Sequence, residues 1–157
     1  HEKYKKRFKG MLPYLLGIVD ALTHLRTLHL TLHDGERVWK KDALIVSVGN
    51  GAYIGGGMKA TPFADPFDGL FEVSVVSSIS RAKFLRLLPS FIKGEHTGLP
   101  EVEYFRTKEL YVECPEECLI NYDGELGSGM PVRYKIIPGA VKMLVRQDMT
   151  AANTEEK

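Results

Sequence analysis

The sequence predicts an α+β fold that is mainly β: an antiparallel β-sandwich-like domain with two helical segments. Three observations indicate this class: many short runs of alternating apolar and polar residues, turn residues between them, and two stretches with helical spacing. With 157 residues, 44% apolar and 26% charged, the chain has the size and composition of one ordinary globular domain. We expect that domain to cover residues 1–149 and to be followed by a disordered polar tail, 150–157.

The N-terminal stretch predicts an amphipathic helix, because its apolar residues recur every three or four positions. Gly10 and Pro13 are expected to split or bend it. Its basic residues have two interpretations. They could form a surface that docks on anionic lipid. The favoured interpretation is that they are the solvated face of a helix packed on the sheet. The apolar positions are Tyr4, Phe8, Met11, Leu15, Val19 and Leu22, and the basic ones are Lys3, Lys5, Lys6, Arg7 and Lys9.

The next segments predict strands. Leu28–His33 alternates strictly between apolar and polar residues, which is typical of a half-buried strand. Asp34-Gly35 is a hairpin turn signal, and Val38–Lys41 is the expected return strand. Ala43–Val48 is almost wholly apolar, as in a central strand. Leu70–Val76 alternates again and predicts a further strand.

A second helix is predicted over Arg81–Lys93, with Ser80 as its N-cap and Gly94 at its C-terminal end. Pro89 inside this helix predicts a kink. Shorter runs then predict strands at Val102–Phe105, Glu109–Glu113, Leu119–Tyr122, Val132–Ile137 and Val141–Val145, with turns at Pro115, Asp123-Gly124 and Pro138-Gly139.

Charge and hydropathy exclude several functions. Lys and Arg number 21 against 20 Asp and Glu, so the net charge of +1 gives no global field that favours nucleic acid. No apolar run approaches the ~20 residues of a membrane span, and the basic start is followed by no cleavable apolar core. The chain begins at His1 without a methionine, and we expect it to be a piece of a longer protein.

The two cysteines have a C-x₃-C spacing around Pro115, which is neither the C-x-x-C redox spacing nor half of a zinc site. Two plain thiols in a reducing cytoplasm are the favoured interpretation of Cys114 and Cys118. A disulfide between them is the alternative, and it would need a tight turn.

Two motifs carry most of the functional information. Asn50–Phe71 holds a Gly-rich turn, a Pro-spaced loop and an Asp-Gly turn, and Asp123-Gly124-Glu125 follows an apolar strand. Glycines at this density weaken packed elements unless the backbone needs their freedom. Over nearly the whole chain, this order resembles the second domain of the soluble diacylglycerol and sphingosine kinases. The resemblance implies a β-sandwich domain with helices that lines the lipid cleft of a two-domain kinase.

The resemblance also implies a catalytic role for Glu125 as the acceptor of the lipid hydroxyl proton, in one motif with Asp123. A plain hairpin is the alternative. The chain contains a second copy of the tripeptide, Asp34-Gly35-Glu36, which we interpret as a simple turn because it lacks the strand context of the family.

A magnesium site is a further implication. By resemblance, Asp65 and Leu70 would bind Mg²⁺ through their carbonyls and Asp68 through its carboxylate, and oxygen ligands are those that this ion prefers. The alternative is an Asp-Gly turn without an ion, in which Asp68 caps its own backbone. The resemblance favours the metal.

Gly55, Gly56 and Gly57 are the candidate substrate-binding residues. They would form a wall where the lipid or its hydroxyl approaches the main chain. A bulge and loop that serve only strand geometry are an equally weighted alternative.

The resemblance therefore implies the lipid-binding domain of a cytoplasmic kinase that contacts the membrane peripherally. Such an enzyme transfers the ATP γ-phosphoryl to the hydroxyl of diacylglycerol or a related lipid, giving phosphatidic acid. The family's Gly-Gly-Asp-Gly-Thr nucleotide loop does not occur in the sequence. We therefore expect ATP to be bound mainly by an N-terminal domain in cis, and this fragment alone to be inactive. A homodimer, a sphingoid or ceramide kinase domain, and a non-catalytic lipid- or protein-binding module remain open.

Overall fold

The structure is a computed structural model that describes residues 26–55, 57–142 and 144. The predicted N-terminal helix and polar tail lie outside these residues. Within the described part of the chain, no helix is long and apolar enough to cross a membrane. The elements are β1 (Leu28–His33), β2 (Val38–Gly49), β3 (Phe71–Ser77), α3 (Arg81–Lys93), β4 (Val102–Thr107), β5 (Glu109–Glu113), β6 (Leu119–Tyr122), β7 (Glu125–Ser128) and β8 (Val132–Lys135).

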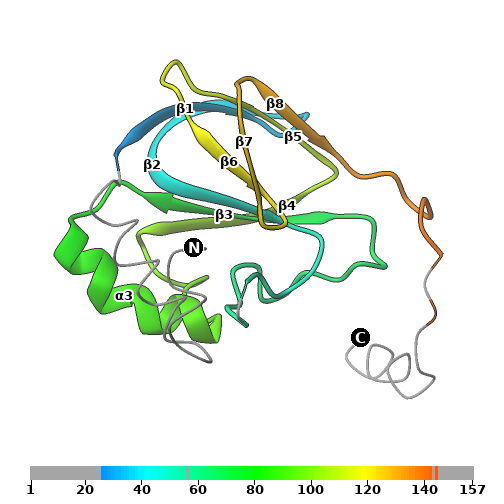
Figure 1. Cartoon of the computed structure of the whole chain (residues 1–157), viewed down its shortest axis with the longest axis horizontal. Coiled ribbons are helices and arrows are strands. Elements are labelled where there is room, and N and C mark those ends of the chain that lie inside the picture. Colours follow the sequence, from blue (N-terminus) through cyan, green and yellow to red (C-terminus); the bar gives the residue numbers. More distant parts are fainter. Residues whose placement is uncertain (1–25, 56, 143, 145–157) are drawn as a thin grey trace.

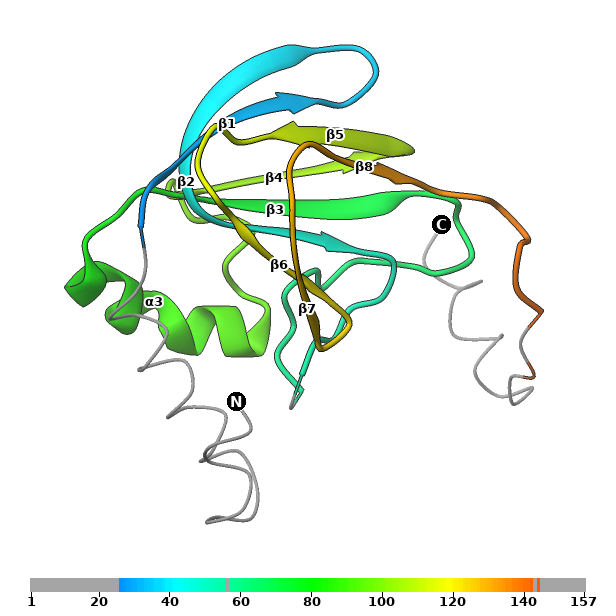
Figure 2. The ribbon, with the colours of Figure 1, turned by 45° about the horizontal axis from the view of Figure 1, so that its top comes forward.

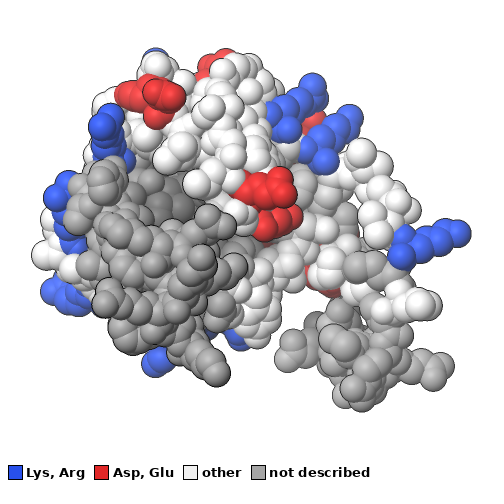
Figure 3. Space-filling model, in the orientation of Figure 1, with Lys and Arg blue, Asp and Glu red and all other residues white. Residues whose placement is uncertain are grey.

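Six strands form one antiparallel sheet in the order β4-β3-β2-β1-β5-β8, and β6 pairs with β7 in a separate two-stranded ribbon. The sheet is strongly curved, and the ribbon crosses it while α3 lies near one end of β3 (Figures 1 and 2). This arrangement confirms the predicted class, a mainly β, antiparallel, sandwich-like domain. Basic and acidic side chains are both spread over the face in Figure 3, which agrees with the near-neutral net charge.

The long strand β2 joins two segments that the sequence predicts separately. Its first half pairs with β1, from Val38 opposite His33 to Ala43 opposite Leu28. Its second half pairs with β3, and the register shifts between Ala43 and Ile45. The prediction of two separate strands, Val38–Lys41 and Ala43–Val48, was therefore wrong, because Asp42 pairs with His29 and continues the ladder.

Helix α3 has the predicted bounds and caps. The Ser80 side chain accepts a hydrogen bond from the Lys83 amide, and Gly94 ends the helix with φ 80°, in the left-handed region that favours glycine. The helix continues through Pro89, which is exposed. Its apolar face packs on the sheet and forms a core cluster of Leu44, Val76, Phe84, Leu88, Phe91 and Val102.

A second core cluster lies across the sheet, and it consists of Leu30, Leu32, Ala43, Val73, Val75, Leu110, Val112, Cys114 and Cys118. Because strand residues alternate between faces, Val73 and Val75 point into this cluster, and Val76 points toward α3. Glu72 and Ser74 share the face of Val76, and both are buried. The α3 side of β3 therefore contains a buried carboxylate.

Two strand predictions near the C-terminus were wrong. No strand is predicted directly after the Asp123-Gly124 turn, yet Glu125–Ser128 forms β7 by pairing with β6. Conversely, a strand is predicted over Val141–Val145. In that segment the described residues Val141, Lys142 and Leu144 belong to no strand, and both Val141 and Leu144 are exposed.

Candidate functional site

The Asp123-Gly124 pair forms the two-residue tip of the β6–β7 ribbon. Asp123 has φ 51° and Gly124 has φ 105°, which is the pattern of a type I′ hairpin turn and explains why this dipeptide occurs here. The Gly124 amide donates a hydrogen bond of 2.7 Å to Asn121 Oδ1 and so fixes the turn. Glu125 is the first residue of β7, pairs with Tyr122 and is exposed. The turn therefore presents the Glu125 carboxylate to solvent beside the ribbon tip.

The second copy of the tripeptide has a different local structure. Asp34 Oδ1 accepts hydrogen bonds from the amides of Glu36 and Arg37, at 3.1 and 2.8 Å. Arg37 also pairs with Asp34 through its guanidinium, 2.8 Å from Oδ2. Glu36 thus lies inside a capped turn between β1 and β2, whereas Glu125 begins a strand. The geometry distinguishes the two glutamates, as the strand context in the sequence does.

The Gly-rich connection after β2 contains a small closed hairpin. Ile54 and Met58 exchange two backbone hydrogen bonds, of 2.9 and 3.1 Å. Gly55 and Gly57 lie between them with φ 53° and 101°, and Gly56 is not described. The glycines therefore serve a tight turn, as the strand-geometry alternative predicts. A Cβ on Gly57 would meet nothing within 4 Å, so its main chain is also accessible.

Each aspartate of the predicted metal loop caps its own backbone. Asp65 Oδ1 accepts from the Phe67 amide at 2.9 Å, and the Asp65 carbonyl accepts from the Asp68 amide at 3.3 Å. Asp68 Oδ1 accepts from the Leu70 amide at 2.8 Å, and Asp68 Oδ2 pairs with the guanidinium of Arg106. In the described ranges, no three His, Cys, Asp or Glu side chains are grouped to hold a metal. Asp68 is thus engaged at both oxygens, and a Mg²⁺ ion there would have to share its carboxylate with the Leu70 amide and the Arg106 guanidinium.

Two contacting residues, Arg106 on β4 and Glu72 on β3, were not predicted from the sequence. They lie directly opposite each other in the antiparallel ladder, and Arg106 Nε is 2.8 Å from Glu72 Oε1. The Glu72 carboxylate also lies beside the hydroxyl of Tyr104. The pKa of this hydroxyl is raised far above its usual value, first by burial and second by Glu72. In the sequence, Glu72 stands between Phe71 and Val73 in an alternating strand, which predicts a solvent-facing side chain. Only the fold shows that this face is buried.

His96 is a buried structural histidine. Its Nε2 donates to the Ala60 carbonyl at 3.1 Å, and its ring stacks on Phe91 with centroids 4.4 Å apart. Burial lowers the pKa of His96, which keeps the ring neutral. No chemistry is predicted for it from the sequence. Its bond to Ala60 ties the loop after α3 to the β2–β3 connection, upstream of the predicted metal loop.

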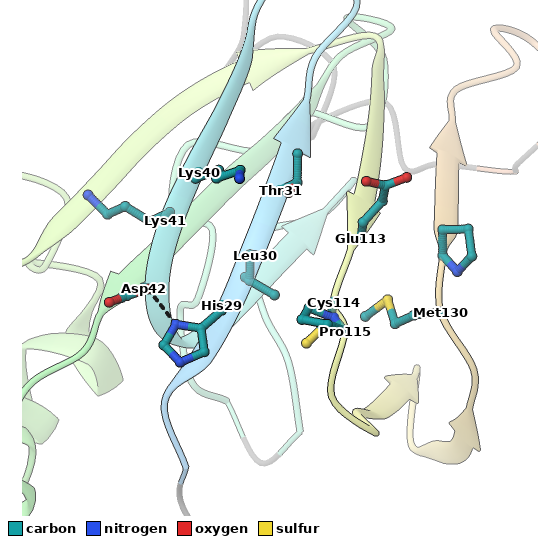
Figure 4. Close-up of a pocket in the computed structure, with 11 residues that line it drawn as sticks. His29, Leu30, Thr31, Lys40, Lys41, Asp42, Glu113, Cys114, Pro115 and Met130 are labelled. Atoms are coloured by element: carbon teal, nitrogen blue, oxygen red, sulfur yellow. Dashed lines mark hydrogen bonds and ion pairs between the residues drawn. The ribbon is translucent and has the colours of Figure 1, made fainter.

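A surface cavity of about 530 Å³ lies away from these motifs, between β1, β2 and the segment after β5 (Figure 4). His29 donates to Asp42 at its rim, at 2.7 Å, and Cys114 lines its wall. The Cys114 and Cys118 sulfur atoms are 2.7 Å apart, and both thiols are free. Among the described residues, no predicted site residue lines the cavity, so it forms no part of the candidate site.

The comparisons with known proteins agree with this fold. Residues 2–145 match the family described as the YegS C-terminal NAD kinase beta sandwich-like domain, and the chain belongs to this family. A diacylglycerol kinase of Mycobacterium tuberculosis is 35% identical over 136 residues, which are 86% of this chain and 44% of that protein. A diacylglycerol kinase of Bacillus subtilis is 25% identical over 126 residues, 80% of this chain and 42% of that protein.

Solved structures show the same fold. One from Bacillus anthracis superposes with a TM-score of 0.64 at 24% identity, over 80% of this chain and 41% of that one. A diacylglycerol kinase from the same organism gives a TM-score of 0.54 at 21% identity, over 78% and 44%. The chain thus spans less than half the length of these relatives. It corresponds to the C-terminal domain of this lipid kinase family.

Proposed function

We propose that this chain is the lipid-binding domain of an ATP-dependent kinase that phosphorylates diacylglycerol or a related lipid. The observation that carries the proposal is the ribbon tip: a type I′ turn at Asp123-Gly124 presents an exposed Glu125, in a chain whose relatives are named diacylglycerol kinases. Phosphoryl transfer needs mainly positioning and charge stabilisation, so a single well-placed carboxylate is a sufficient chemical contribution from this domain.

In this proposal Glu125 accepts the proton of the lipid hydroxyl as its oxygen attacks the γ-phosphorus of ATP. The new O–P bond replaces the bond to ADP, and the products are a phosphatidic-acid-like lipid and ADP. Asp123 contributes by adopting the left-handed conformation that the turn requires. Gly55, Gly56 and Gly57 would let the lipid headgroup approach the main chain of the β2–β3 connection.

ATP and its Mg²⁺ would be bound mainly by an N-terminal domain of the same protein. The metal belongs to the co-substrate in this scheme, where it would neutralise the transferring phosphoryl group. Peripheral contact with the membrane would supply the lipid on the cytoplasmic side. Exposed apolar residues near the candidate site suit such contact. They are Tyr53, Ile54, Phe63 and Phe67 on the β2–β3 connection, and Leu119, Tyr122 and Leu126 on the ribbon.

The test compares the 157-residue chain with the full-length protein in mixed micelles that contain diacylglycerol or ceramide and radiolabelled ATP. We expect the full-length protein to label diacylglycerol and the chain alone to label nothing. A Gly-Gly-Asp-Gly-Thr segment in the parent reading frame would support the kinase. A full-length protein that binds lipid vesicles but labels neither lipid would favour the non-catalytic module, and preferential labelling of ceramide would favour the sphingoid alternative.

A further inference from the structure

Arg106 contacts two carboxylates from different parts of the chain. Its Nε lies 2.8 Å from Oε1 of Glu72 on β3, and its terminal nitrogen pairs with Oδ2 of Asp68 in the β2–β3 connection. Glu72 is only 1% exposed and Asp68 is 23% exposed at the side chain, whereas Arg106 itself is 48% exposed. One guanidinium therefore links a buried strand carboxylate to a loop carboxylate.

Glu72 requires such a partner. A carboxylate without a counter-charge is costly to bury, so buried acids are paired or bind a cation. Among the described residues, the ion-pair partner of Glu72 is Arg106. The antiparallel register places the two residues directly opposite each other, so the pairing follows from the sheet itself.

Each carboxylate oxygen of Asp68 has a partner. Its Oδ1 accepts from the Leu70 amide, which orders the last turn of the loop, and its Oδ2 faces the guanidinium. The guanidinium donates a hydrogen bond to Asp68 and forms an ion pair with Glu72. Because its nitrogens are held in one plane, it fixes both contacts more firmly than a single ammonium group would. The loop is thereby held on β3 by a fixed positive charge.

We propose that Arg106 is the cation that holds the Asp65–Leu70 loop against β3, at the place where the family resemblance implies Mg²⁺. A divalent ion at Asp68 would have to share that carboxylate with the guanidinium, and like charges at contact distance repel. Arg106 is thus a positioning residue for the loop. The inference concerns loop order and stands whether or not the chain supports phosphoryl transfer.

The experiment is thermal unfolding of the 157-residue chain in chelator-treated buffer, with MgCl₂ titrated against NaCl of equal ionic strength. The wild type should show no Mg²⁺-specific rise in Tm. Arg106→Gln should lower Tm by roughly 10 °C, because it leaves a buried carboxylate without a partner. The same variant should gain a Mg²⁺-dependent rise in Tm, since an ion bound only by the folded state stabilises it. The double variant Asp68→Asn/Arg106→Gln should lose that gain.

Arg133→Gln is the matched control, because Arg133 also pairs with a glutamate across neighbouring strands, Glu109 at 2.8 Å, but both side chains are more exposed. It should change Tm little and respond to Mg²⁺ no more than the wild type.

Three results for the wild type and Arg106→Gln overturn the proposal. The first is a Mg²⁺-specific rise in the wild type that Asp68→Asn abolishes, which would mean that an ion orders the loop. The others are an Arg106→Gln variant with wild-type Tm, or one that is destabilised but insensitive to Mg²⁺. If Arg106→Gln does not fold, Arg106→Lys replaces it. A lysine keeps the charge without the two-carboxylate geometry, so we expect a folded variant whose Tm lies below that of the wild type. A wild-type Tm would again contradict the proposal.

Discussion

Thr61 fills the space beside the Cα of Gly49. A Cβ built on Gly49 would lie 2.1 Å from Thr61 Oγ1, and that hydroxyl donates to the Gly51 carbonyl at 2.9 Å. Thr61 is fully buried, so it cannot move aside into solvent. The end of β2 and the return of the Gly-rich connection are therefore packed against each other at a position where only glycine fits.

From this contact we predict that Gly49→Ala destabilises the fold by about 1–3 kcal/mol, the usual range for forcing a methyl group into a packed site. Gly51→Ala is the control, because a Cβ there meets nothing within 4 Å. Urea unfolding of the two variants measures the difference. Equal free energies of unfolding for both would show that Thr61 does not restrict position 49.

The proposed function gives the two Asp-Gly-Glu copies different roles, which substitutions in the full-length protein can compare. Glu125→Gln keeps the shape of the side chain and removes the base, so kcat should fall by about 10²–10⁴, with a smaller change in apparent lipid affinity. In the control, Glu36→Gln should retain activity and change stability by less than ~0.5 kcal/mol, because the turn uses the Glu36 amide and not its carboxylate. A folded Glu125→Gln enzyme with near-normal kcat would leave the tripeptide as a plain hairpin.

The N-cap of α3 gives a prediction on stability. Ser80 Oγ accepts from the Lys83 amide at 3.3 Å, so Ser80→Ala should cost about 1 kcal/mol. Ser80→Asp preserves an acceptor at the same position and should stay within a few tenths of a kcal/mol of the wild type. Chemical denaturation of both variants tests this, and identical losses would show that the cap does not contribute.

His29 predicts a dependence on pH. Its hydrogen bond to Asp42, together with the charges of Asp42 and Glu116, raises the pKa of His29 above its ordinary value of 6.5. Because the folded-state pKa is raised, the stabilisation is fully present below about pH 6.5 and is lost as pH rises through the folded pKa. An NMR titration should give a His29 pKa above 6.5 in the wild type and a lower one in Asp42→Asn. The same pKa in both proteins would contradict the pairing.

The local sequence pattern was sufficient to predict the bounds of one helix and several strands. β1, α3, β5 and β6 have the predicted bounds, because each has a clear period and, for the helix, a cap at either end. β7 was missed because Glu125–Ser128 has little apolar alternation and is held by pairing with β6. Val141 and Leu144 belong to a mostly apolar segment that predicts a strand, but strand formation also needs a neighbour, and the described residues there pair with none.

The candidate site could be predicted only where its residues are close in sequence. Asp123 and Glu125 share one turn, and Asp65, Asp68 and Leu70 share one loop, so motif and spacing identify them. Arg106 is 38 residues from Asp68, and their contact depends on the register between β3 and β4. Sequence analysis without that register cannot indicate which cation neutralises Asp68.

The strand order has a consequence for how the chain folds. The first four strands pair with their neighbours in sequence, β1 with β2, β2 with β3 and β3 with β4. β5 instead returns to β1, where Thr31 lies opposite Glu113, a separation of about 80 residues. Closing so long a loop costs more entropy before contacts can compensate. We therefore expect the β1–β4 meander to form first, and the ribbon after β5, with the candidate base at its tip, to be among the last parts put in place.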